Sequence, residues 1–178
     1  MSQASLEPNH LYDYLRRHAR SQSFICVLVK LPRYFTTADE LQTTFEFVSE
    51  GPNGRIPKLV QYSETNLKDF YNLAFGNKNP ITGELDDLAI SNNGDTEKVL
   101  ATVIDTLYAF CYRYPDAWVY AAGSTPARTR LYRMGLNRFY EEAVDDFVIF
   151  GQLADDWEEF SPYADYAGFA VHLIKPLT

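Results

Sequence analysis

The segment GSTPARTR at residues 123–130 brings together a glycine, three hydroxyl side chains, a proline and two arginines. We expect a strand to end before this segment and a helix to begin in it, with Thr125 as the N-cap and Pro126 in the first helical position. The free N–H groups of such a helix start, its positive dipole end and a neighbouring guanidinium attract an anion, and Gly123 lets a ligand come close to the backbone. The segment is therefore the candidate site for an anion or another small ligand.

The two arginines of this segment are expected to point in different directions. Arg128 lies one helical turn before Tyr132 on the stripe that the helix buries, so its guanidinium faces the sheet, whereas Arg130 points away. An isolated buried charge is costly, so Arg128 needs a partner. That partner is either the carboxylate of Asp86 or Asp87, in a structural ion pair, or a bound phosphate or carboxylate, and one guanidinium can serve both.

A second turn, SNNGD at residues 91–95, also follows an expected strand and opens an expected helix. Its two asparagines suit a tight turn with left-handed backbone conformations, which makes the turn primarily structural, and ligand contact through their amides is the alternative. Asp95 is expected to cap the helix, where it competes with an incoming phosphate for the same N–H groups. The complete set of candidate ligand-binding residues is Gly123, Ser124, Thr125, Arg128, Arg130, Asn92, Asn93, Asp86 and Asp87.

Residues for catalysis are few. Ser124 follows a glycine but lacks the G-x-S-x-G context of an activated serine, and Asp86 and Asp87 point to opposite faces if they lie in a strand. Tyr132 is the candidate catalytic residue, as a proton donor, and its place on the buried stripe fits core packing equally. The three histidines and two cysteines have no metal-ligand spacing, so we expect no metal site and can name no cofactor.

The charge of the chain limits its partners. The formal net charge is −8 and the pI about 4.8, so binding to nucleic acid or to an anionic membrane surface is not expected. Residues 141–159 hold eight acidic residues and no basic one, which is typical of a solvated surface and also suits a basic protein partner. No signal peptide is evident and no apolar run is long enough to span a bilayer, so we expect a cytoplasmic protein.

Hydrophobic periodicity predicts an α+β fold with a mixed, mostly antiparallel sheet and two main helices, in the order β-β-β-β-α-β-α-β-β. We expect one domain over residues 30–178, preceded by an N-terminal extension over residues 1–29 that contains a short helix and a strand. Trp157 and Phe160 are expected in a packed loop between the last two strands. The expected strands are 43–49, 55–63, 69–75, 85–91, 117–123, 147–153 and 166–175, and the expected helices are 97–114 and 126–144.

Several of these motifs together resemble an uncharacterised bacterial family, seen mainly in Bacteroidetes and catalogued as a domain of unknown function. They are YNLAFG, DD-x-x-x-SNNGD-x-x-KVLATV, GSTPARTRLY, FVIFG and YAGFAV. The resemblance covers residues 33–175. It implies a single-domain cytoplasmic protein and carries no activity with it.

The layout is also similar to the core of the GNAT acyltransferases. In that fold the fourth strand and the following helix hold the pyrophosphate of coenzyme A, and a tyrosine in the last helix often serves as general acid. SNNGD stands where that family has a Q/R-x-x-G-x-G/A loop, and ARTRLYRMGL is similar to A-x-x-x-Y-x-x-x-G-F, with Tyr132 five residues after Ala127 rather than four.

Three functions therefore follow from the sequence. The first is a soluble binding domain with an anion or small-ligand site at residues 123–130. The second, implied by the GNAT resemblance, is a coenzyme A-dependent N-acyltransferase with a degenerate cofactor loop and Tyr132 as its acid. The third is a protein-interaction module of the inhibitor or immunity type that uses residues 141–159.

Overall fold

The protein is an α+β unit in which one open, mostly antiparallel sheet carries helices on one face. The computed structural model describes residues 32–89 and 91–174, and the N-terminal extension predicted over residues 1–29 lies outside them. The described helices are α2 (Thr96–Arg113) and α3 (Pro126–Asp146). The strands are β1 (Thr37–Ala38), β2 (Thr44–Gly51), β3 (Gly54–Glu64), β4 (Phe70–Lys78), β5 (Leu85–Asp86), β6 (Trp118–Ala121), β7 (Phe147–Gln152), β8 (Trp157–Glu159) and β9 (Gly168–Leu173).

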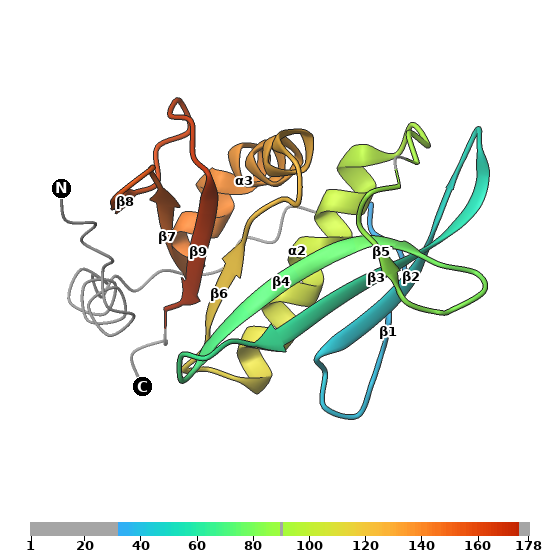
Figure 1. The fold of residues 1–178 in the computed structure, drawn as a ribbon, viewed down its shortest axis with the longest axis horizontal. Coiled ribbons are helices and arrows are strands. Elements are labelled where there is room, and N and C mark those ends of the chain that lie inside the picture. The colour runs from blue at the N-terminus through green and yellow to red at the C-terminus, as the bar shows by residue number, and fades with distance from the viewer. Residues whose placement is uncertain (1–31, 90, 175–178) are drawn as a thin grey trace, which may run out of the picture.

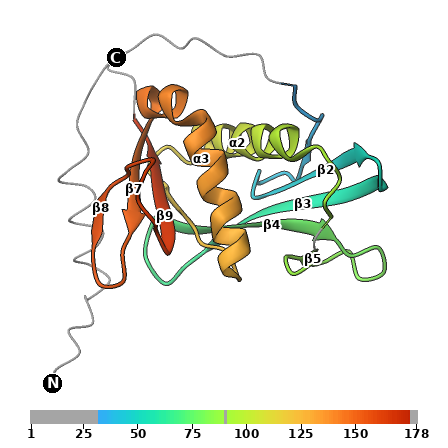
Figure 2. The same ribbon diagram turned by 90° about the horizontal axis from the view of Figure 1, so that it is seen from above.

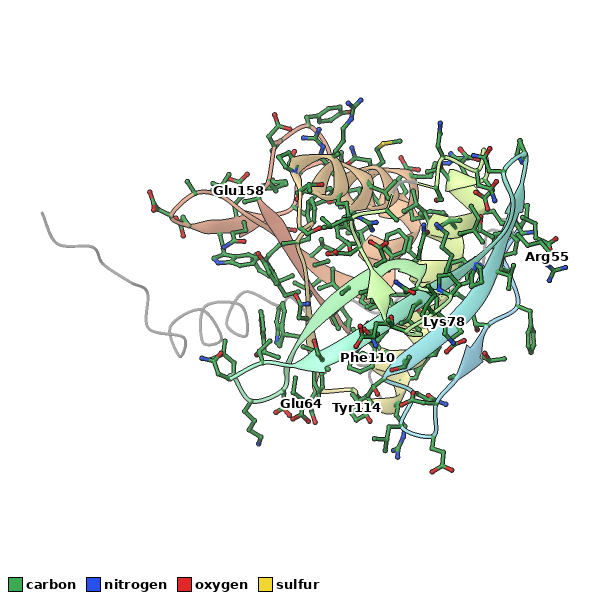
Figure 3. All side chains as sticks on the ribbon, turned by 45° about the vertical axis from the view of Figure 1, so that its right-hand side comes forward. Arg55, Glu64, Lys78, Phe110, Tyr114 and Glu158 are labelled. Carbon is green, nitrogen blue, oxygen red and sulfur yellow. The ribbon has the colours of Figure 1, made fainter. Side chains whose placement is uncertain are left out.

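The sheet has the strand order β1-β2-β3-β4-β6-β9-β7-β8. The short strand β5 is outside this order and pairs with β4. Neighbouring strands run antiparallel except β4 and β6, which are parallel and are joined through α2. Figure 1 shows β4 and β6 at the centre of the sheet, and Figure 2 shows both helices on the same face. Within the described part of the chain, Arg55 and Glu158 lie toward opposite ends in Figure 3.

Aromatic side chains fill the space between the sheet and α2. Phe110 of α2 is fully buried, and its ring stacks on that of Tyr62 at a centroid distance of 4.1 Å. Tyr71 and Tyr114 also contact the Phe110 ring, at 5.0 and 4.8 Å. A smaller cluster includes Trp118 and extends the core. The apolar residues that recur at intervals of three and four in α2 thus form the predicted buried stripe.

The turn chemistry of the sequence explains where α3 and the first hairpin begin. The side chain of Thr125 accepts a hydrogen bond from the backbone N–H of Arg128, and Pro126 occupies the first turn, so the predicted cap is confirmed. The predicted hairpin is confirmed too: β2 pairs over its whole length with the first eight residues of β3, ending in the pair Gly51 and Gly54. Gly54 has a φ of 88°, a conformation that glycine adopts without strain.

The strand predicted over residues 85–91 is wrong beyond its first two residues, since β5 covers only Leu85–Asp86. The reason is local, because the carboxylate of Asp86 accepts hydrogen bonds from the backbone N–H groups of Leu88 and Ala89. Such a side-chain turn competes with strand pairing for the same backbone groups. The segment therefore leaves the sheet and passes over the end of β4.

Two short strands were not predicted. β8 forms within the segment expected to be a packed loop, where it pairs with β7 through three residues. Trp157 and Phe160 are buried there, as predicted, because they pack over neighbouring strands. The two-residue strand β1 pairs with β2. Both lie at sheet edges and are too short for periodicity to reveal them.

Two further observations bear on function classes. Neither of the two described helices is apolar enough along its length to cross a membrane. Burial raises the pKa of the Cys111 thiol to about 12, so this cysteine has the character of a packed core residue.

Candidate anion-binding site

The first turn of α3 separates two cavities. The outer cavity, of about 500 Å³, lies on the side of Ser124, Thr125 and Arg130. The inner cavity, of about 240 Å³, lies between α3, the start of α2, the SNNGD turn and the sheet. The residues that line the inner cavity are Lys58, Phe75, Gly76, Ala89, Ser91, Asn92, Asn93, Asp95, Thr96, Val99, Ala127, Arg128 and Leu131.

Among the described residues, the outer cavity has one cation without an ion pair, Arg130. Arg130 and Ser124 are exposed at its edge, while Arg133 forms an ion pair with Asp165. Gly123 lines this cavity, but a side chain there would collide with the backbone of α3, because a Cβ atom would lie 2.2 Å from the nitrogen of Thr129. The glycine is thus explained by close packing of the chain against the helix, rather than by access for a ligand.

Arg128 faces the sheet, as predicted, and lines the inner cavity. Its guanidinium donates to the carbonyl oxygens of Phe75 (2.7 Å) and Ala89 (3.1 Å) and lies 5.8 Å from the centre of the Phe75 ring. An ion pair with Asp86 or Asp87 is absent from the contacts of residues 32–89 and 91–174. The carbonyls hold the guanidinium in place without neutralising its charge.

Lys58 of β3 supplies a second cation, which was not among the predicted site residues. Its residue surface is only 4% exposed, and its ammonium donates to Oδ1 of Asn77 and Oγ of Ser91, each at 2.7 Å. Both acceptors are neutral, and Lys58 has no ion pair within the described part of the chain. Burial lowers the pKa of Lys58, and the nearby charge of Arg128 lowers it further, whereas Asp95 opposes the shift.

The two cations are held by the same two segments. Arg128 donates to the carbonyls of Phe75 in β4 and Ala89 in the segment after β5. Lys58 donates to the side chains of Asn77 and Ser91, each two residues after one of these carbonyls. Two residues of a strand span roughly 7 Å. The two donors therefore lie close enough for one small molecule to touch both.

The start of α2 closes the inner cavity. Asp95 occupies the N-cap position, but its side chain makes no cap hydrogen bond. Its carboxylate instead accepts hydrogen bonds from the hydroxyls of Ser49 (2.6 Å) and Tyr34 (2.7 Å), so the predicted side-chain cap is wrong. Among residues 32–89 and 91–174, the first-turn N–H groups of α2 thus have no carboxylate partner at the cavity where Thr96 lies.

The SNNGD turn is fixed to the β2–β3 hairpin by Asn93. This side chain donates to Oγ of Ser49 and to the carbonyl of Gly54, and it accepts from the backbone N–H of Asn53. Asn92 has a φ of 40° and is exposed at the cavity edge. Asn93 therefore has the structural role expected for this turn, and it also lines the inner cavity.

The structure separates the remaining candidate residues from the inner cavity. Asp86 organises its own turn and Asp87 follows it, and neither lines the cavity. Tyr132 lies in the core, where its ring meets Phe75 edge-on at 5.7 Å and borders an apolar cavity of about 60 Å³. Burial raises the pKa of Tyr132, and a hydrogen bond with the Phe75 backbone partly offsets this. No group of acidic, histidine or cysteine side chains among the described residues could hold a metal ion.

Fold and site together define a small α+β domain with a two-cation cavity between its helices and its sheet. The chain belongs to a family of unknown function, DUF6934, whose model matches residues 30–174. This confirms the predicted membership of a family without an assigned activity. Comparison with curated proteins and with solved structures gives no significant match.

The buried ammonium of Lys58 makes the free energy of unfolding depend on pH. Comparison of a Lys58→Met variant with the wild type measures this contribution. Folded Lys58 releases its proton below the ordinary pKa of 10.5, so between these two pKa values the unfolded state binds more protons and stability rises with pH. The free energy of unfolding of Lys58→Met minus that of the wild type should therefore fall as pH rises through this window, by at most about 1.4 kcal/mol per pH unit. Urea unfolding of both proteins at several pH values measures it, and a constant difference would show that folding leaves the Lys58 pKa unchanged.

Proposed function

We propose that the protein binds a small anionic ligand in the inner cavity. One observation carries this proposal: two cations, Lys58 and Arg128, line one cavity, and within the described part of the chain they donate only to neutral acceptors. Asp95 is the one carboxylate among the lining residues, and two hydroxyl groups already donate to it. The charge of the cavity is therefore positive whenever Lys58 is protonated, and an anion would balance it.

The cavity favours a compact ligand. Its volume of about 240 Å³ corresponds to roughly eight water molecules at the density of the liquid. A phosphate or a short carboxylic acid fits this space, and the free N–H groups at the start of α2 add donors that suit an anion. Asn92, Thr96 and Ala127 are exposed at the edge of the cavity, which gives a ligand a route from solvent.

Calorimetric titration with inorganic phosphate tests the proposal on three proteins: the wild type, Arg128→Gln and Arg130→Gln. Loss of one charge-assisted hydrogen bond corresponds to about 1.5–3 kcal/mol, so Arg128→Gln should weaken phosphate binding roughly 10- to 100-fold. Arg130→Gln removes the same charge from the same helical turn, but on the outer side, and should leave binding unchanged.

The variants also separate the two sides of the helix start. If Arg130→Gln abolished binding and Arg128→Gln did not, the ligand would lie in the outer cavity and the proposal would fail. Absence of phosphate binding by the wild-type protein at millimolar concentration would also count against it. Thermal unfolding of Arg128→Gln without ligand checks that the variant is folded at the titration temperature.

Coenzyme A-dependent acyl transfer is a second candidate function. Two features support it: β4 and β6 are parallel and are connected through α2, and the first-turn N–H groups of α2 lie at the inner cavity. The acyltransferases that the layout resembles hold a pyrophosphate after their fourth strand, at the start of the following helix. The burial of Tyr132 gives its hydroxyl little access to a substrate. Calorimetry with acetyl-CoA tests this function, and no heat of binding at millimolar concentration would remove it.

A further inference from the structure

The amine of Lys58 has a placement that anion binding alone does not require. A cation that only attracts an anion can remain solvated, as arginine and lysine usually do, whereas Lys58 is almost completely buried and lines a cavity large enough for a ligand. We propose that Lys58 forms a Schiff base with a small aldehyde or ketone whose anionic group binds at Arg128. The proposal rests on the proposed function for the anionic group and adds a covalent step at Lys58.

The geometry of Lys58 suits a nucleophile. The residue lies within β3, between β2 and β4, so the base of its side chain is held by the sheet. Asn77 and Ser91 accept two hydrogen bonds from the amine and fix its position. A neutral primary amine has two N–H groups and one lone pair. When both N–H groups donate to these acceptors, the lone pair remains for a ligand in the cavity.

Burial favours the neutral form of the Lys58 amine, which is the reactive form. The charged groups that act on Lys58 are Asp95 from the start of α2 and Arg128 from α3, and its contacts on β4 and on the segment after β5 are neutral. Burial contributes most to the lowered pKa of Lys58. The charge of Asp95 opposes this shift, and the smaller effect of Arg128 adds to it. A desolvated lysine beside another cation is an established way of activating an amine.

The proposed step is a condensation that releases one water molecule. The lone pair of the neutral amine attacks the carbonyl carbon, a C–N bond forms and the oxygen takes up a proton, which gives a carbinolamine. The C–O bond then breaks, the oxygen leaves as water with both amine hydrogens, and a C=N bond remains. No oxidant, reductant or metal ion is needed, and hydrolysis by the reverse steps releases the ligand.

The spacing of the two cations defines the ligand class. The groups that hold Arg128 and Lys58 are two residues apart along β4, a separation of roughly 7 Å. A ligand that spans them has its carbonyl carbon within a few bonds of its anionic group. Short oxo acids and short aldehyde phosphates share this chemistry.

Reductive trapping on the wild-type protein tests the inference. The protein is incubated near neutral pH with sodium cyanoborohydride and one of three probes: pyruvate, glycolaldehyde phosphate or uncharged acetone. Peptide mass mapping then measures the modification at each lysine. We expect faster modification at Lys58 than at Lys68, whose side chain is 92% exposed, because burial lowers the pKa of Lys58 and so leaves more of its amine in the neutral form. One of the anionic probes should also exceed acetone by tenfold or more.

The Lys58→Arg variant locates the covalent step. Arginine forms no Schiff base with these probes, so trapping at this position should disappear, whereas the slower trapping at Lys68 should continue. Phosphate binding by the wild type without modification at Lys58, or with modification no faster than at Lys68, would overturn the inference and leave the proposed function standing. Modification at Lys58 that is equally fast with acetone, together with no phosphate binding, would remove the anionic requirement and the proposed function with it.

Discussion

Replacing Phe110 with alanine is expected to lower the free energy of unfolding by about 3–5 kcal/mol. The ring is fully buried and contacts the rings of Tyr62, Tyr71 and Tyr114. Its removal leaves a cavity between α2 and the sheet, and the stacked ring of Tyr62 loses its partner at 4.1 Å. Urea unfolding monitored by circular dichroism measures the change.

Tyr112→Ala is the matched control for Phe110→Ala. Tyr112 lies two residues further along α2 and is 70% exposed, so its replacement should change the free energy of unfolding by no more than about 0.5 kcal/mol. Equal losses in the two variants would contradict the packing of this face of α2 against the sheet.

Replacing Gly51 with alanine should destabilise the protein by about 1–3 kcal/mol and also abolish anion binding. A Cβ atom on Gly51 would lie 1.9 Å from the carbonyl oxygen of Asn93 and 2.8 Å from its side chain. The SNNGD turn must then move away from the hairpin, which breaks the hydrogen bonds from Asn93 to Ser49 and Gly54. Because this turn lines the inner cavity, its displacement changes the cavity itself.

Gly54→Ala distinguishes this collision from general strain in the hairpin. A Cβ atom on Gly54 would meet nothing within 4 Å, although its φ of 88° makes alanine unfavourable there. This variant should therefore lose stability but keep phosphate affinity. If Gly51→Ala bound phosphate as tightly as Gly54→Ala, the turn would not be needed for the site.

Local signals in the sequence predicted most of the fold. The apolar spacing of α2, the Thr125–Pro126 start of α3 and the PNG turn of the first hairpin each specify a structure within a few residues, and each is confirmed. The end of β5 could not be read in the same way, because Asp86 turns the chain by binding N–H groups that a strand would otherwise use. Both conformations are compatible with its local sequence.

The candidate site was predicted in part, since the α3 start and the SNNGD turn do lie together at one cavity. Lys58 was missed, although the sequence contains a signal for it. In a strand, alternate residues share a face, and Lys58 alternates with Ile56, Val60 and Tyr62, all apolar. A lysine within such a row indicates a buried amine. The partners of Arg128 could not be predicted, because they are backbone carbonyls brought together only by the folded chain.

A phosphate titration followed by amide chemical shifts in ¹⁵N-labelled protein shows which cavity the anion enters. The backbone amides of Asn93, Thr96 and Arg128, around the inner cavity, are expected to shift together with a single dissociation constant. The amides of Ser124 and Arg130, on the outer side of the same helix start, should remain in place. Shifts confined to Ser124 and Arg130 would place the anion in the outer cavity and rule out the two-cation site.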